Sequence, residues 1–392
     1  MSTLINNAES VQIRPLQYRD LTWLEPYWQS DRSGGISWDT LQRWFPLLKL
    51  LSTFPNPARH LAAIAVAESG QKPCGAIQIS PFNHSRSTWR IDRVLALLPS
   101  LSEGQSLTLA QDVGIRLLRH CLETVWEART WVGEVDSSDQ SLIALYRQTG
   151  FQPLAQLNHW SLSPAQLATL AQREPDLPNL LPVSNVDAGL LYQLDTVSMP
   201  PLLRQTFDRH VDDFRISLLR RWSIGFWQWL NGHHRCSGYV FEPQRKAAIA
   251  YFHLQIAEDS SQNHVARLTV HPAYTWLYPE LIAHMARLLA SCPAADLHLS
   301  SADYQPEREE YLKQIGAEHQ GQRLLMARSV WHKLRETRFV SLEGLQLADV
   351  FNGLQPGRAP APGRIGSTAP VPIRTRNAEP LLSTGWDLPP VL

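Results

Sequence analysis

The sequence lacks any imbalance of charge. Among its 392 residues, lysine and arginine total 36 and aspartate and glutamate also total 36, so the formal net charge is zero. A protein that binds nucleic acid or an anionic membrane through its overall electrostatic field carries a basic excess. The composition therefore argues against both of these binding modes.

Cysteines and long apolar runs are also scarce. Cys74, Cys121, Cys236 and Cys292 lie far apart and form no CxxC or Cys/His spacing, so neither a disulfide framework nor a metal site is predicted. No apolar run reaches the roughly 18 residues of a membrane span, and the first residues lack the apolar core of a signal peptide. These features predict free thiols in a cytoplasmic protein.

Apolar residues are plentiful enough for two cores. They make up 44% of the chain, and segments typical of strands and helices recur in the same order in two parts of it. A proline-rich stretch separates the two parts, and Pro/Gly-rich sequence follows them. We predict an N-terminal domain at 9–162, a linker at 163–183, a C-terminal domain at 184–340 and a disordered tail at 341–392.

Two amphipathic helices are the clearest elements of this repeat. Apolar residues recur at intervals of three and four over 107–127, where Gly114, Leu117 and Cys121 share one face, and again over 278–290. One apolar stripe on an otherwise polar helix is typical of a helix that packs on a sheet. Each helix is therefore predicted to cover a sheet of its own half.

Three segments resemble the GCN5-related N-acetyltransferase (GNAT) family. They are the opening "IRPLQYRDL", the strand "WRIDRVLALLP" that ends in proline before a helix, and "SSDQSLIALYRQTGF", a helix with a tyrosine shortly before Gly-Phe. The resemblance covers about 9–162 and, more faintly, 181–340. It implies an α/β fold of two tandem GNAT-like domains, each with a mixed, splayed central sheet flanked by helices.

The resemblance also implies acetyl-CoA as a substrate. In this family the pantetheine arm lies where the sheet splays, and the pyrophosphate binds backbone N–H groups at the start of the following helix, where glycines allow close approach. The matching positions of this chain are Leu97, Leu98, Ser102, Gly104, Gln105, Ser106 and Gly114.

The family's glycine motif fits this chain in two registers. Read from Gln111, it retains the glutamine and Gly114 but places Arg116 where only a small residue fits. Aligning the leucine pair that starts at Leu117 makes Gly114 the last small residue and brings Asp112 close to the expected phosphates. We prefer this second register, which leaves the enlarged loop "SLSEGQS" as the phosphate-binding segment. Gly114 is equally well explained as a glycine that lets its helix pack closely.

The resemblance assigns acid and base roles as well. Tyr146 matches the family's tyrosine that protonates the departing thiolate, and Glu134 or Asp92 is the candidate base for the amine. Each has a simpler explanation, because a helix tyrosine is often a packing residue and either carboxylate can pair with Arg90 or Arg93 on a strand face. These alternatives remain open from the sequence.

The C-terminal part departs from the family pattern. No glycine occurs between Gly238 and Gly316, and Leu312 stands where Tyr146 aligns. Residues with a Cβ atom hinder a close approach of backbone to phosphate. This part is therefore not expected to bind coenzyme A in the usual way.

Two functions follow from these features. The first is an acyl-CoA-dependent N-acetyltransferase with acetyl-CoA in its N-terminal domain. The second is a catalytically degenerate GNAT-fold protein that acts as a binding or assembly factor through aromatic surfaces and its tail. Residues 381–392, with an apolar cluster around Trp386, are a candidate docking peptide for a protein partner, although Trp386 is equally able to fold back on its own domain.

Overall fold

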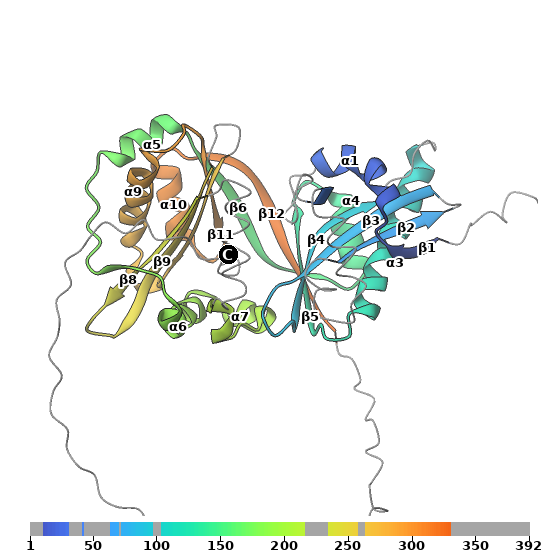
Figure 1. Ribbon diagram of the computed structural model, residues 1–392, viewed down its shortest axis with the longest axis horizontal. Coiled ribbons are helices and arrows are strands. Elements are labelled where there is room, and N and C mark those ends of the chain that lie inside the picture. Colours follow the sequence, from blue (N-terminus) through green and yellow to red (C-terminus); the bar gives the residue numbers. More distant parts are fainter. Residues whose placement is uncertain are drawn as a thin grey trace, which may run out of the picture. The chain divides into compact units, whose positions relative to one another are not determined.

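The computed structural model describes residues 11–30, 41–42, 63–69, 72–96, 103–215, 234–257 and 263–330. The predicted tail at 341–392, with its docking peptide, lies outside these residues. The elements of residues 11–162, called the N-terminal half, are β1 (Gln12–Pro15), α1 (Leu21–Ser30), β2 (Ala63–Ser69), β3 (Lys72–Pro81), β4 (Thr88–Ala96), α3 (Glu103–Thr124), β5 (Thr130–Asp136), α4 (Gln140–Gln148) and β6 (Gln152–Leu162) (Figure 1).

Residues 163–330, called the C-terminal half, repeat this order with two helices more than the described N-terminal half, one at their start and one before their second strand. Their elements are α5 (Pro164–Ala171), β7 (Leu180–Pro182), α6 (Ala188–Ser198), α7 (Pro201–Phe207), β8 (His234–Glu242), β9 (Ala247–Ile256), β10 (His264–Val270), α9 (Leu277–Leu289), β11 (Leu297–Ala302), α10 (Pro306–Gln314) and β12 (Glu318–Ser329). The strands join in one mixed sheet in the order β1-β2-β3-β4-β5-β12-β6-β11-β10-β9-β8-β7.

The helix predicted at 107–127 is α3, and its bounds differ from the prediction. It begins at Glu103 and ends at Thr124, so most of the segment expected to be an enlarged loop is helical. An acidic residue is favourable in the first turn of a helix, and a single glycine such as Gly104 costs a helix only about 1 kcal/mol. These local preferences allow the helix to begin earlier than the apolar stripe does.

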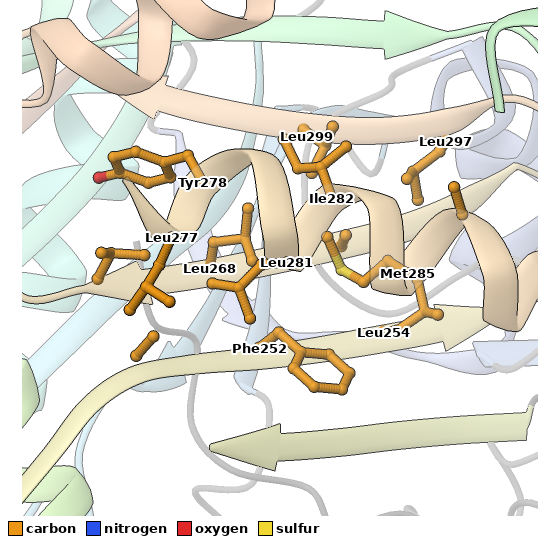
Figure 2. Close-up of a cluster of buried hydrophobic side chains, with 14 of the residues drawn as sticks. Phe252, Leu254, Leu268, Leu277, Tyr278, Leu281, Ile282, Met285, Leu297 and Leu299 are labelled. Carbon is orange, nitrogen blue, oxygen red and sulfur yellow. The ribbon is translucent and has the colours of Figure 1, made fainter. Parts of the chain in front are cut away.

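The two amphipathic helices pack as predicted. On α3 the buried residues Leu117 and Cys121 join a core with the strand residues Ile77, Trp89 and Trp131. In the C-terminal half, α9 lies against β9, β10 and β11, as Figure 2 shows. The side chains that fill this layer include Phe252, Leu254, Leu268, Leu277, Tyr278, Leu281, Ile282, Met285, Leu297 and Leu299.

The ends of α4 and α10 reveal the duplication in atomic detail. Gly150 and Gly316 follow these helices with φ of +85° and +74°, in the left-handed region that glycine adopts without strain. After Gly150, the N–H of Phe151 donates to the carbonyl of Tyr146 at 2.9 Å. After Gly316, the next N–H donates in the same way to the carbonyl of Leu312 at 3.0 Å. Leu312 therefore replaces Tyr146 at an equivalent position.

In each half, two parallel strands pair briefly and then stop pairing. β4 pairs with β5 only from Thr88 to Ile91, and β10 pairs with β11 only at His264 and Val265. We call the unpaired stretches that follow the β4/β5 break and the β10/β11 break. With this splay in both halves, the predicted fold class is confirmed.

The last strand of each half pairs with the sheet of the other half. β12 lies between β5 and β6, with Ser329 opposite Thr130 and Arg323 opposite Asp136. β6 in turn pairs with β11, from Leu162 opposite Leu297 to Leu157 opposite Ala302. The two halves therefore complete each other's sheets.

A second connection joins the β3–β4 turn to α7. The Asn83 side chain donates to the carbonyl of Asp208 at 2.9 Å, and Thr88 Oγ1 donates to the carbonyl of Thr206 at 2.9 Å. The rings of Phe82 and Phe207 stack with centroids 4.8 Å apart. These contacts hold residues of the C-terminal half beside the start of β4.

All four cysteines are free thiols, with Cys74 and Cys121 buried and Cys236 and Cys292 half-buried. Among the described residues, no helix has both the length and the apolar character needed to cross a membrane.

The strand exchange predicts that a residue late in the sequence stabilises the N-terminal half. Met326 on β12 is fully buried in the core that contains Trp131 and Phe151. Met326→Ala should lower the free energy of unfolding by about 2–5 kcal/mol, as truncation of a buried side chain does. Hydrogen exchange should increase in β5 and α4.

Leu289→Ala on α9 is the matched control, because Leu289 is 5% exposed and belongs to the C-terminal core. It should increase exchange in β9 to β11 instead. An effect of Met326→Ala confined to β9 and β10 would contradict the strand exchange.

Candidate functional site

A β-bulge shapes the β4/β5 break. Ile91 is opposite Ile79 and Arg93 is opposite Gln78, so Asp92 is an extra residue on β4 at the point where pairing with β5 ends. Bulges redirect a side chain and often lie beside active sites. In the C-terminal half, β10 pairs with β9 without such an irregularity.

Asp92 combines burial with an unused hydrogen-bond acceptor. Its side chain is 1% exposed, and its Oδ1 accepts a hydrogen bond from Arg90 Nε at 2.6 Å. Its Oδ2 is buried and meets no hydrogen-bond donor of the described chain. A buried carboxylate oxygen without a donor is unfavourable, so it is a feature that a bound group or a function would explain.

Tyr146 reaches the same break from α4. Its ring packs against Gly133 of β5, where an added Cβ atom would lie 2.7 Å from the phenol oxygen. Burial raises the pKa of Tyr146 above its usual value, and the carboxylates of Asp92 and Glu134 raise it further. The phenol is therefore protonated at neutral pH and is a donor, which is the form that a general acid requires.

The structure thus brings the three predicted catalytic residues to one break, on two faces of the sheet. Trp89 and Ile91 belong to the core with α3 and α4, so Arg90 between them points to the opposite face. Glu134 follows the same alternation on β5, where Trp131 and Val135 belong to that core. Tyr146 approaches from the helix side, and Arg90 and Glu134 lie on the other side.

The simpler explanation for the two carboxylates is confirmed in part. Asp92 pairs with Arg90, as that explanation predicts. Glu134 does not pair with Arg90 or Arg93, but lies 3.8 Å from Arg323 of β12, and its side chain is 32% exposed. Arg323 could not be identified from the sequence as its partner, because the strand exchange brings it there from nearly 190 positions away along the chain.

The predicted cofactor-binding residues are not brought together in the same way. Leu97, Leu98 and Ser102 lie outside the described residues. Gly104, Gln105 and Ser106 lie in the first turn of α3 and not in a loop, although backbone N–H groups at a helix N-terminus are suited to anions. Their role as phosphate ligands stays a prediction.

Gly114 lies in the middle of α3, where it packs against α4. An added Cβ atom would lie 2.4 Å from Leu145 Cδ1, closer than any ordinary contact. Gly133 has a comparable role on β5, where it makes room for Tyr146. A lone glycine within the strand "TWVGEVD" is the sequence signal that could have revealed this close approach.

The β10/β11 break contains a buried arginine. Arg308 of α10 is 1% exposed, and its Nη1 donates to the carbonyl of Leu268 at 3.3 Å, on the stretch of β10 that β11 does not pair. Its Nη1 also donates to Gln305 Oε1 at 3.3 Å, whereas Nε and Nη2 are buried with no acceptor from the described residues. Burial lowers the pKa of Arg308. A side chain of α10 therefore occupies a backbone acceptor on the unpaired stretch of β10.

No group of three or more His, Cys, Asp or Glu side chains within the described ranges is arranged to hold a metal ion.

No family model matches the chain, and no curated protein sequence matches it. The chain is similar to a solved tandem GNAT protein from the clavulanic acid biosynthesis pathway, with 12% identity and a TM-score of 0.48 over 81% of this chain and 98% of that one. It is also similar to a GCN5-related N-acetyltransferase from Sphaerobacter thermophilus, with 10% identity and a TM-score of 0.46 over 81% and 95% of the two chains. Such low values assign no role to any residue.

Gly114→Ala separates the packing role from a phosphate-binding role. In the natural chain it should lower the free energy of unfolding by about 1–3 kcal/mol, because the new methyl group overlaps Leu145. In a Leu145→Ala background the same change should be neutral or stabilising by up to about 1 kcal/mol, the helix preference of alanine over glycine. Urea unfolding of the four variants measures both effects. Equal losses in the two backgrounds, together with a weakened interaction with acetyl-CoA in both, would indicate a phosphate-binding glycine instead.

Arg308→Met tests whether the buried guanidinium is uncompensated. Methionine retains much of the volume and removes a buried charge with unpartnered N–H groups, so the free energy of unfolding should rise or change by less than about 1 kcal/mol. Arg287→Met, an exposed change on α9, is the control for the loss of one positive charge. A loss of more than about 3 kcal/mol at Arg308, with little effect at Arg287, would indicate a buried ion pair.

Proposed function

We propose that this protein is an acyl-CoA-dependent N-acetyltransferase that acts at the β4/β5 break. The observation that carries the proposal is the convergence of a buried carboxylate and a buried phenol on one interruption of strand pairing. The Oδ2 atom of Asp92 has no hydrogen-bond donor among the described residues. Tyr146 packs in the N-terminal core beside Phe151, and its hydroxyl lies against Gly133 at the break.

The residues at the break fit an acyl thioester. Beyond Ile91, no described strand pairs with β4 on the β5 side, which would leave its backbone groups available to an extended ligand. The Oδ2 atom of Asp92 is buried and unpartnered at the same point. Acetyl-CoA would supply an activated acyl group there and a thiolate as the leaving group.

Asp92 is the better candidate for the base. An amine must lose a proton in order to attack a carbonyl carbon, and a carboxylate with a free oxygen can accept that proton directly or through water. Arg90 holds the other oxygen at 2.6 Å and orients the carboxylate. Glu134 is more exposed and already faces Arg323, so it is better suited to a supporting electrostatic role.

Tyr146 is the candidate acid. Its raised pKa keeps the phenol protonated, and its position against Gly133 directs the hydroxyl towards β5 at the break. A proton donated by Tyr146 from the helix side of the sheet would neutralise the departing thiolate. Asp92, which Arg90 holds from the other side, would accept the proton of the amine. The two proton transfers would not compete for one group.

We assign this activity to the N-terminal half alone. In the C-terminal half, Leu312 replaces the tyrosine, β10 has no bulge, and Arg308 donates to the unpaired part of β10. The alternative role as an assembly factor depends on residues 381–392, which lie outside the described part of the chain.

Calorimetric titration with acetyl-CoA, followed by thiol release with a panel of primary amines, tests the proposal. Saturable binding and thiol release are expected. The absence of both binding and a thermal shift at millimolar acetyl-CoA would contradict it.

Two substitutions test the assigned roles. Asp92→Asn and Tyr146→Phe should each lower kcat by about 100-fold or more while acetyl-CoA affinity is retained, because each removes a proton transfer and not a binding contact. Glu134→Gln and Tyr311→Phe, the tyrosine beside Leu312, are the matched controls and should change kcat by only a few-fold. A larger loss with Glu134→Gln than with Asp92→Asn would transfer the base role to Glu134.

A further inference from the structure

A cluster of unpartnered polar side chains lies on the sheet of the C-terminal half, on the face opposite α9. Strand register places Ser237, His253 and Arg267 in one row across β8, β9 and β10, and places Tyr251 opposite Thr269 in the next row. The residues that alternate with them on β10, such as Leu268, belong to the core under α9. The cluster therefore faces away from α9.

Each member of the cluster has polar atoms without a partner. Ser237 Oγ, Tyr251 Oη, His253 Nδ1 and Thr269 Oγ1 are buried, and no hydrogen bond to the described chain accounts for them. No hydrogen bond or ion pair links Arg267 to other described residues, although its side chain is half-buried. Buried polar groups are normally paired, so several orphans on adjacent strands point to a missing ligand.

The charges around Arg267 define the kind of ligand. Burial has the largest effect on the pKa of Arg267, and charges of nearby side chains follow. Arg90 and Glu134 of the N-terminal half are among them, together with Tyr251 and Arg209 of the C-terminal half. Arg90 has Asp92 as a counter-ion, and Arg209 has Asp195 at 2.9 Å. No carboxylate of the described residues lies within ion-pair distance of Arg267, and Glu134 acts on its pKa only from farther away. An arginine stays charged at neutral pH. One uncompensated positive charge suits one negative charge.

The neighbours of Arg267 can contribute neutral hydrogen bonds. Burial, followed by the charges of Arg267 and Arg235, lowers the pKa of His253 to about 3. The imidazole is therefore neutral at pH 7, and one ring nitrogen carries a proton. The hydroxyl of Ser237, opposite His253, can donate or accept. A guanidinium flanked by neutral donors is well suited to a carboxylate.

The cluster lies near the β4/β5 break, where the proposed acyl transfer would occur. Arg267 lies within electrostatic range of Arg90 and Glu134, which belong to the β4/β5 break and lie on its side away from Tyr146. We infer that Arg267, with Ser237 and His253, binds the carboxylate of the acceptor, which is a molecule that carries both a primary amine and a carboxylate, such as an amino acid or a short peptide. This inference rests on the proposed function, because the amine of such a molecule would face Asp92.

Paired acceptors test the inference in the full-length protein. Thiol release from acetyl-CoA is measured with amino acids and with their own carboxamides, which differ only in the negative charge. The acid should be preferred by about tenfold or more in kcat/KM, as expected for a charge-assisted hydrogen bond. Arg267→Gln should remove this preference by raising KM for the acid, with kcat and the amide reaction little changed.

Two further variants control for folding and for charge. Arg267→Lys should restore part of the preference, and Arg287→Gln, an exposed change on α9, should leave it intact. Thermal unfolding of each variant shows whether the fold is retained. Equal use of acids and amides by the natural protein, or equal effects of Arg267→Gln and Arg287→Gln, would overturn the inference.

A binding experiment without acetyl-CoA separates this inference from the proposed function. Calorimetric titration with N-acetyl amino acids and with their amides should show binding of the acids only, and Arg267→Gln should abolish it. This result would support the anion site even if no acyl transfer occurs. Absence of binding by both, or binding of inorganic phosphate in place of the acids, would overturn the carboxylate assignment.

Discussion

The structure depends on the interruption of parallel strand pairing in each half. β4 and β5 pair over four residues and β10 and β11 over two, after which each strand presents backbone groups without a strand partner on that side. Such groups need a hydrogen-bond partner wherever they are buried. The two halves meet this requirement differently, and the difference is the main reason to assign chemistry to one of them.

In the C-terminal half, a side chain of that same half supplies a hydrogen-bond donor to the unpaired stretch of β10. Arg308 donates to the Leu268 carbonyl, and Leu312 fills the place of the tyrosine. The N-terminal half leaves its break available and adds a bulge at Asp92 and a close approach of Tyr146 to Gly133. Under the proposed function, duplication followed by specialisation would explain this contrast, because one half would retain the chemistry and the other would bind the acceptor through Arg267 and its polar neighbours.

Local features were predictable from the sequence, and features created by distant pairing were not. Apolar periodicity predicted α3 and α9, and the order of elements predicted the duplication, because both depend on neighbouring residues. The resemblance around Tyr146 identified a residue that lies at the β4/β5 break. The exchange of β6 and β12 leaves no local signature, so the pairing of Glu134 with Arg323 and the isolation of Arg267 could be seen only in the folded chain. The loop conformation predicted before α3 was wrong from Glu103 onwards, where the chain is helical, and the phosphate-binding role stays a prediction.

The most direct test of the account is hydrogen–deuterium exchange of the full-length protein with and without acetyl-CoA. Protection should increase in β4 beyond Ile91 and in the first turns of α3, where unpaired backbone groups would gain partners, and should stay unchanged in β10 and α10. Protection confined to β10 and α10, or no change in either half at saturating acetyl-CoA, would contradict the claim that only the N-terminal break accepts the acyl donor.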